Sequence, residues 1–200
     1  MARLRDMGRD VHVAIVTRGM PPHFEADAVE AVRAEARAAH ACLGVSETHY
    51  LDLPAAELDR VLHRDLNRAV AELVTRVAPD TLILPFVGDI HLDHQLIFTS
   101  GLVAARPRTA AFPLRIWCYE TLSETNWYAP YVTPGFSPNL FVDISDHLER
   151  KLEAFDCYRS QVQAFPNERS VESLRALAAL RGSTVHRRAA EAFVLVREVA

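Results

Sequence analysis

The sequence predicts an α/β fold in which a mostly parallel β-sheet carries helices on both faces. Two observations lead to this prediction. Continuous β-branched runs are typical of buried parallel strands, and longer stretches of helical composition alternate with them. The chain has 200 residues, of which 50% are hydrophobic, and this suits one globular domain that we expect to span 1–200.

The first half of the chain shows the alternation most clearly. Strands are predicted at 11–17, 48–53 and 81–86, and helices at 24–44 and 55–79. Gly44 is expected to cap the first of these helices, and Pro79 follows the second. Within the second helix, apolar residues from Leu58 to Leu73 recur at a spacing of three to four. A further short helix is expected to begin near Asp93.

The second half is less regular. Strands are predicted at 114–120 and 139–145, and helices at 145–162, capped by Ser145, and at 170–182. Between the two strands, residues 121–138 are rich in Pro, Ser, Thr and aromatic residues. Loops of this kind often carry binding residues, so we expect part of a ligand site there.

Composition excludes several classes of protein. A net charge of −4 gives no basic surface for nucleic acid, and no apolar run approaches the length of about 20 residues that spans a membrane. The three cysteines are isolated, which argues against a disulfide framework and for a reducing compartment. The N-terminus is charged and lacks an apolar signal-peptide region, so we expect a cytoplasmic protein. Its oligomeric state stays open, with a homo-oligomer as one option.

The stretch GDIHLDHQ, residues 88–95, is the strongest candidate site. His91 and His94 are three residues apart, so on a helical turn both imidazoles lie on one face, with Asp89 and Asp93 close by. One histidine could bind a metal while the other, oriented by either aspartate, acts on a reacting group. The alternative is a polar loop with a helix cap and solvated histidines. Ligands in open α/β sheets bind beyond the carboxyl ends of strands, and this stretch follows such an end.

Several further stretches, in the same order, resemble one protein family. They are GRDVHVAIVTRG, LPFVGDIHLDHQ, YETLSETNW, FSPNLFVDIS, KLEAFDCYRSQV and LRGSTVHRRAAEAFVLVR. Together they resemble the PIG-L/LmbE-like zinc-dependent N-deacetylases, which remove acetyl groups from substrates that contain N-acetylglucosamine. The resemblance implies a Rossmann-like three-layer sandwich and a metal-dependent hydrolase that acts on a linear amide of a small-molecule or glycoconjugate substrate.

The resemblance also implies roles for particular residues. His94 falls where the family has a zinc ligand, and His91 where it has the histidine that stabilises the tetrahedral intermediate and helps to protonate the amine. Asp93 matches the carboxylate that tunes this histidine. Glu120 and Trp127 resemble a wall of the sugar pocket, although local packing of the loop explains them equally well. Arg18, which follows a predicted strand, is a third candidate substrate-binding residue, and the cofactor is expected to be Zn²⁺, or Fe²⁺ with the same ligands.

The family's other hallmark, an H-P-D-D-E motif that supplies two zinc ligands and the general base, has no counterpart in the sequence. We therefore expect an N-terminally incomplete deacetylase domain that lacks its first strand and is nearly inactive by itself. Two hypotheses remain open: an active deacetylase whose sequence starts further upstream, and a non-catalytic relative that binds a glycan or a protein. A nucleotide-binding protein is a weaker third reading, because no glycine-rich phosphate loop is present.

Overall fold

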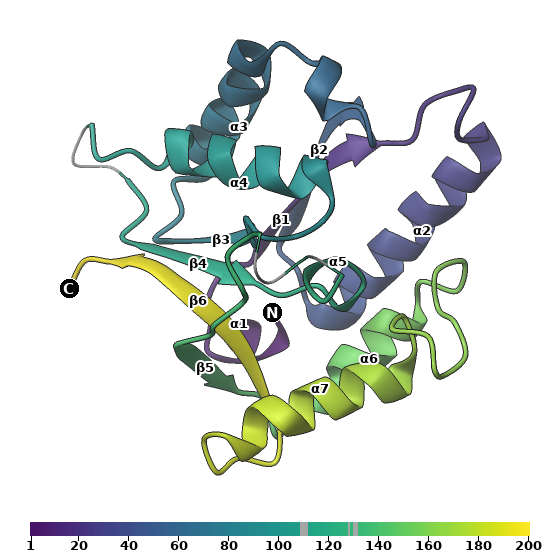
Figure 1. Ribbon diagram of the computed structural model, residues 1–200, viewed down its shortest axis with the longest axis vertical. Helices are drawn as coiled ribbons and strands as arrows, with labels where there is room; N and C mark the ends of the chain where they lie inside the picture. Colours follow the sequence, from purple (N-terminus) through teal and green to yellow (C-terminus); the bar gives the residue numbers. More distant parts are fainter. Residues whose placement is uncertain (109–111, 128, 130–131) are drawn as a thin grey trace. The chain divides into compact units, whose positions relative to one another are not determined.

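The structure is a computed structural model that describes residues 1–108, 112–127, 129 and 132–200 (Figure 1). Two compact units make up the chain. Unit 1 comprises Met1–Ala55 and Phe141–Glu191, and unit 2 comprises Ala56–Leu140 and Ala192–Ala200. Helices and strands are mixed in both units, so the predicted α/β class is confirmed. The single domain over 1–200 stays a prediction.

Unit 1 is built around a pair of parallel strands, β1 (His12–Arg18) and β2 (Glu47–Pro54). Its helices are α1 (Ala2–Asp6), α2 (Ala26–Leu43), α6 (Leu148–Asp156) and α7 (Val171–Ser183). Helix α2 ends at the predicted glycine. Gly44 adopts the left-handed conformation, with φ of 73°, that glycine tolerates best. Helix α2 packs against α6, and small residues such as Ala39 and Ala154 form the core between them.

Unit 2 contains a short 3₁₀ turn, η1 (Leu58–Arg60), the helices α3 (His63–Val77), α4 (Leu92–Ala104) and α5 (Leu122–Thr125), and the strands β3 (Thr81–Pro85) and β4 (Arg115–Tyr119). Strands β3 and β4 are parallel, and β4 pairs antiparallel with β6 (Ala190–Glu198). With β5 (Leu140–Asp143), these strands form a sheet in the order β3-β4-β6-β5. The parallel strands therefore lie in two sheets, and the larger sheet is mixed.

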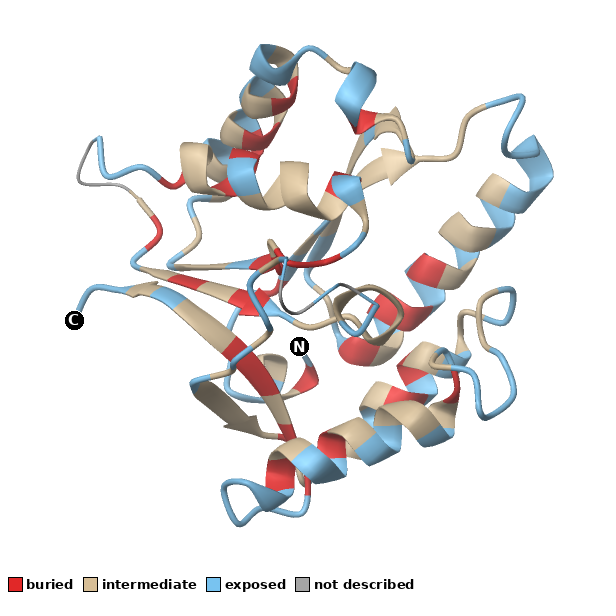
Figure 2. Cartoon of the chain, in the orientation of Figure 1, coloured by how far each residue is buried: buried red, intermediate tan, exposed pale blue. Residues whose placement is uncertain are grey.

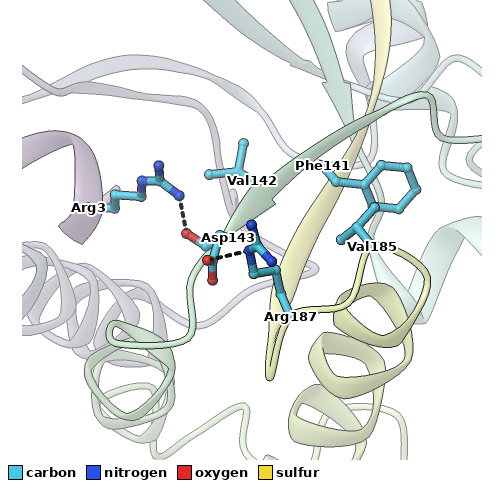
Figure 3. Close-up of a pocket in the computed structure, with 6 residues that line it drawn as sticks. All are labelled: Arg3, Phe141, Val142, Asp143, Val185 and Arg187. Carbon is cyan, nitrogen blue, oxygen red and sulfur yellow. Dashed lines mark hydrogen bonds and ion pairs between the residues drawn. The ribbon is translucent and has the colours of Figure 1, made fainter.

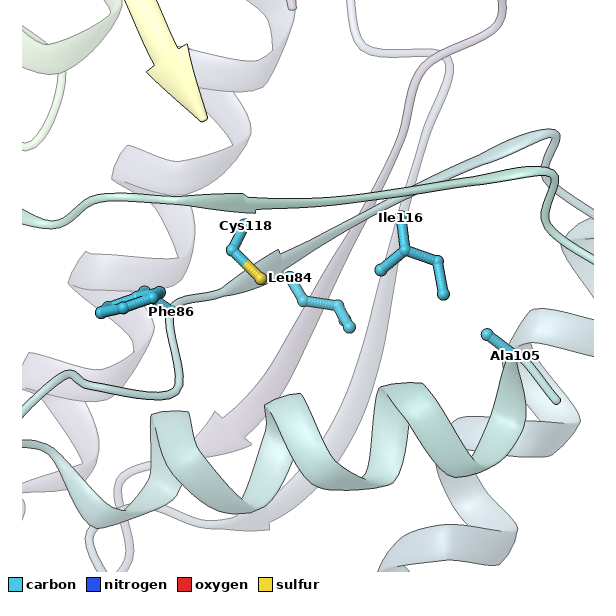
Figure 4. Packing of buried hydrophobic residues seen from close by; sticks show 5 residues of the cluster. All are labelled: Leu84, Phe86, Ala105, Ile116 and Cys118. Atoms are coloured by element: carbon cyan, nitrogen blue, oxygen red, sulfur yellow. The ribbon is translucent and has the colours of Figure 1, made fainter. Parts of the chain in front are cut away.

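The core of unit 2 lies between this sheet and α4. Figure 4 shows Leu84 and Ile116 directed from neighbouring strands toward the helix. Gly101 permits the close approach, because a Cβ atom there would lie 2.5 Å from a methyl carbon of Leu84. Figure 2 places further buried positions along α3 and α4. The buried residues of this cluster are Leu84, Phe86, Ala105, Ile116 and Cys118.

One helix prediction is wrong at its start. The helix expected over 55–79 begins only at His63, and η1 precedes it. Val61 is extended, with φ of −79° and ψ of 131°, which interrupts any continuous helix. The amide of Leu58 donates to the carboxylate of Asp93 instead of joining α3. A long-range hydrogen bond thus replaces the local pattern that the apolar spacing predicts.

Ser145 does not cap α6. The cap position is His147, and the Ser145 hydroxyl instead donates to Asp143 Oδ1 at 2.6 Å. The cap at the next helix is different, because the Ser170 hydroxyl accepts from the amide of Ser173 at 3.1 Å. None of the helices that the structure describes is long and apolar enough to cross a membrane.

Candidate functional site

The GDIHLDHQ stretch connects β3 to α4 in unit 2. Strand β3 pairs in parallel with β4, and Pro85 lies opposite Tyr119. The segments that follow both strands therefore leave the same edge of the sheet, which is where ligands bind in folds of this kind. Helix α4 begins directly after His91, so the predicted start near Asp93 is confirmed.

Asp89 is the anchor of this site. Its side chain is completely buried, and its carboxylate lies 2.8 Å from His94 Nδ1. The Thr125 hydroxyl donates to the other carboxylate oxygen at 2.6 Å, while the same hydroxyl accepts from the amide of Thr121 at 2.8 Å. These bonds join the β3–α4 segment to α5. A buried carboxylate needs such partners, because burial of an unpaired charge is costly.

The hydrogen bonds assign opposite tautomers to the two histidines. Nδ1 of His91 accepts from the amide of Asp93 at 3.2 Å, so a neutral His91 carries its proton on Nε2. Nδ1 of His94 faces the Asp89 carboxylate, so a neutral His94 has its proton on Nδ1 and a free lone pair on Nε2. The rings are nearly parallel, with centroids 5.2 Å apart. One histidine therefore offers a hydrogen-bond donor and the other a metal ligand, side by side.

Asp93 has a second set of contacts. Its buried carboxylate accepts from the amide of Ala56 at 2.7 Å and from the amide of Leu58 at 3.3 Å. Its backbone amide, and not its carboxylate, makes the hydrogen bond to His91. The carboxylate thus holds the segment between β2 and η1. The tuning of His91 by Asp93, which the resemblance implies, stays a prediction.

The negative charge of Asp89 affects the pKa of two side chains at the end of β4. Burial raises the pKa of the Cys118 thiol to about 12, and the nearby Asp89 carboxylate adds to the rise. The pKa of the Tyr119 hydroxyl is also raised to about 12, by loss of hydration and then by the same carboxylate. Both groups stay protonated at neutral pH, so neither is a nucleophile or base there.

Gly88 lies where the surrounding atoms leave no room for a side chain. A Cβ atom at this position would lie 2.5 Å from the Phe86 ring and 2.6 Å from the carbonyl oxygen of Pro134. We expect Gly88→Ala to lower the free energy of unfolding by about 1–3 kcal/mol, because backbone must move to admit the methyl group. Urea unfolding measures this loss. Gly135→Ala is the matched control, since its Cβ would meet nothing within 4 Å; an equal loss in both variants would contradict the argument.

The three candidate substrate-binding residues lie in different places. Glu120 follows β4 directly and is half-buried, and Trp127, with 64% of its surface exposed, follows α5. Both are in unit 2, near the segment that Thr125 joins to Asp89. Arg18 ends β1 in unit 1, where its Nη2 lies 3.8 Å from Glu30. Substrate binding by all three stays a prediction, and residues 128, 130 and 131 of the expected binding loop lie outside the described residues.

His94 is placed to bind a metal, but the described residues around it do not complete a set of metal ligands. The orientation of His94 by a buried carboxylate is the usual support of a metal-bound imidazole. Zinc sites that catalyse hydrolysis use about three protein ligands. In the described part of the chain, three such ligand atoms lie within 4.8 Å of one another only at His12, Glu47 and His49, on β1 and β2. The described residues therefore supply one ligand, and not the usual three, for a catalytic metal at His94.

A pocket of about 310 Å³ lies in unit 1 (Figure 3). Arg187 forms an ion pair with Asp143 at 3.1 Å, and Arg3 donates to the Asp143 carbonyl. Hydrogen bonds from Ser145 hold the pKa of the Asp143 carboxyl below its usual range, and the two arginines add to this effect. Both guanidinium groups are thus engaged, and none of the candidate site residues lines this pocket.

Asp89 and Thr125 were the least expected members of the site. The sequence offered Asp89 only as one of two aspartates that could orient a histidine. Thr125 lies in the YETLSETNW stretch, and this stretch was the one signal for it. The bond between the two side chains spans 36 positions, which no local pattern reports.

Comparisons with known proteins agree with the fold. A family model described as PIG-L: GlcNAc-PI de-N-acetylase matches residues 1–105. The conserved protein TT1542 from Thermus thermophilus is 22% identical, with a TM-score of 0.79 over 100% of this chain and 87% of that one. The 4-carboxy-2-hydroxymuconate hydratase GalB from Pseudomonas putida KT2440 is 20% identical, with a TM-score of 0.77 over 100% and 89%. The N,N'-diacetylchitobiose deacetylase from Pyrococcus horikoshii is 21% identical, with a TM-score of 0.71 over 98% and 76%. A hydratase and a deacetylase thus share this fold, and the fold alone does not select the reaction.

Proposed function

Because the chain belongs to the PIG-L family, described as GlcNAc-PI de-N-acetylases, we propose that it is a metal-dependent deacetylase. Its substrate would be an N-acetylglucosamine-type glycan, glycolipid or glycosyl conjugate, and its location the cytoplasm. The observation that carries the proposal is the pair of opposite tautomers at His91 and His94. This pair supplies an N–H donor and a metal-binding lone pair next to each other, and metal-dependent hydrolysis of an amide uses both.

The proposed roles follow from these atoms. His91 donates from Nε2 to the oxygen that becomes negative when water attacks the acetyl carbonyl, and such donors are a large source of rate enhancement. His94 offers Nε2 to the metal, and Asp89 keeps that nitrogen free of its proton. Glu120 and Trp127 are proposed to contact the sugar. When bound, zinc or ferrous iron would polarise the carbonyl and acidify water.

The activity of the 200-residue chain by itself is expected to be very low. Among the described residues, three ligand atoms do not converge at His94, so a metal there would be held weakly. Loss of acid–base assistance alone typically lowers a rate by about 10²–10⁴-fold. A form of the protein extended in frame at its N-terminus is the natural comparison for the chain of residues 1–200.

Acetate release tests this proposal. Both forms are incubated with GlcNAc-PI and with N,N'-diacetylchitobiose, and acetate and bound metal are measured. We expect His94→Ala to abolish the release in whichever form is active, because the metal loses a ligand. His63→Ala, an exposed histidine at the start of α3, is the control and should keep full activity. Activity that survives His94→Ala would refute the role of His94 as a ligand.

The second candidate is a non-catalytic relative that binds a glycan or a protein partner. It is favoured by the carboxylate of Asp93, which holds two backbone amides, and by the incomplete ligand set at His94. Absence of acetate release and of bound metal in both forms, together with saturable binding of chitobiose, would support this candidate over the deacetylase.

A further inference from the structure

Three potential metal ligands meet on β1 and β2, in unit 1. The two strands are parallel, and the register places His12 opposite Glu47 and Ala14 opposite His49. Residues two apart in a strand share a face, so Glu47 and His49 point the same way, and His12 joins them through its partner position. Thr48 points to the opposite face, where its hydroxyl lies 2.7 Å from Nδ1 of His40 on α2. Strand alternation therefore gathers all three ligands on one face.

The distances at this cluster are those of a ligand set. His12 Nδ1 lies 3.0 Å from His49 Nε2, and 3.8 Å from the nearer oxygen of Glu47. The ring planes differ by only 8°, and the centroids are 5.3 Å apart. With such a long centroid separation and so short a distance between nitrogens, the rings meet edge to edge and not face to face. In this arrangement Nδ1 of His12 and Nε2 of His49 face each other.

A divalent transition metal fits that space with small movements. Zinc binds imidazole nitrogen at about 2.0–2.1 Å, so two nitrogens on a tetrahedral ion are about 3.3 Å apart. The two nitrogens would move apart by a few tenths of an ångström from their present 3.0 Å, and the rings would turn so that both lone pairs point at the ion. The Glu47 side chain is 61% exposed and can swing toward the ion. Two imidazoles and one carboxylate also form the ligand set of known zinc and ferrous iron sites.

We propose that His12, Glu47 and His49 form a binding site for a Zn²⁺-class divalent ion, separate from the HxDH site. His49 is the fixed ligand, because its side chain is only 7% exposed, whereas His12 and Glu47 face solvent. Water completes the coordination on the open side. An ion there links the first residues of two neighbouring strands, so it stabilises the start of the β1–β2 pair. The metal-free alternative is a hydrogen bond between the two rings, with Glu47 paired to Nδ1 of His49 at 3.5 Å.

Zinc binding to a variant without the other histidine pair tests this proposal. In the full chain carrying His91→Ala and His94→Ala, we expect isothermal titration with Zn²⁺ to show one bound ion per chain. Adding His12→Ala should weaken this binding by more than about 100-fold, since loss of even an outer-shell partner costs 10–100-fold. Glu47→Gln, which keeps the size of the side chain, should also weaken it.

Stability supplies the second measurement. Zinc should raise the melting temperature of the His91→Ala, His94→Ala protein, because an ion that binds only the folded state stabilises it. This rise should be absent after His12→Ala or Glu47→Gln, both at exposed positions where the fold tolerates change. Adding His63→Ala is the control and should preserve both zinc binding and the rise. Equal zinc binding with and without His12 and Glu47, or loss of binding in the His63→Ala control, would overturn the site.

Discussion

Asp89→Ala is expected to lower the free energy of unfolding by about 3–5 kcal/mol, because hydrogen bonds to a charged group contribute about 1.5–3 kcal/mol each. The buried carboxylate holds His94 at 2.8 Å and the Thr125 hydroxyl at 2.6 Å. Without it, α5 loses its side-chain hydrogen bond to the β3–α4 segment and keeps the backbone bond from the Ile90 amide to the Glu124 carbonyl. Urea unfolding followed by circular dichroism measures the change.

Two variants make the Asp89 experiment specific. Asp89→Asn preserves the shape and can still accept from His94, but it presents an amide donor to one of its two partners, so we expect a smaller loss of about 1–2 kcal/mol. Asp59→Ala removes an exposed carboxylate in η1 and should change the unfolding free energy by less than about 0.5 kcal/mol. If Asp89→Ala behaved like Asp59→Ala, the anchoring role of Asp89 would be wrong.

Asp93→Ala is expected to cost about 2–4 kcal/mol of unfolding free energy. Its carboxylate holds the amides of Ala56 and Leu58, and Leu58 is the buried first residue of η1. Ala56 also has a positive φ of 60°, a strained conformation for alanine that these bonds help to maintain. Thermal and urea unfolding of the variant would report the loss.

The Asp93 result separates two roles. If the residue mainly holds the β2–η1 segment, its loss lowers stability, whereas a residue that mainly tunes His91 would shift the pH profile of acetate release with stability intact. Ala56→Gly is the matched control, because glycine adopts positive φ without strain. We expect this variant to keep the parent stability or to exceed it by up to about 1 kcal/mol.

Local patterns predicted the regular elements well. The strands predicted at 11–17, 48–53 and 81–86 became β1, β2 and β3, and Gly44 ends α2 as its chemistry requires. The HxDH histidines also lie at the carboxyl end of a strand, on the first turn of a helix. Each of these features depends on residues close together in the chain, which is why the sequence reports it.

Most of the features that failed depend on distant partners, whereas the missing Ser145 cap reflects a bond to Asp143 two residues away. Helix α3 starts late because the amide of Leu58 bonds to Asp93, 35 positions away. The same is true of the Asp89–Thr125 bond, and of β6, whose run of apolar residues was noted only as part of a motif. The spacing of apolar residues in the sequence does not show which distant carboxylate a backbone amide will bond to. These contacts therefore become visible only in the folded structure.

The antiparallel pairing of β4 with β6 has a consequence for the newly made protein. Tyr119 pairs with Phe193, so the last part of the chain occupies the edge of β4. At a synthesis rate of about 5–20 residues per second, roughly 80 residues and about 4–16 seconds separate the making of β4 from that of its partner. Throughout that interval the ribosome holds a hydrophobic strand edge that other nascent chains can pair with. We expect chaperones that shield such edges during this interval to raise the yield of this protein.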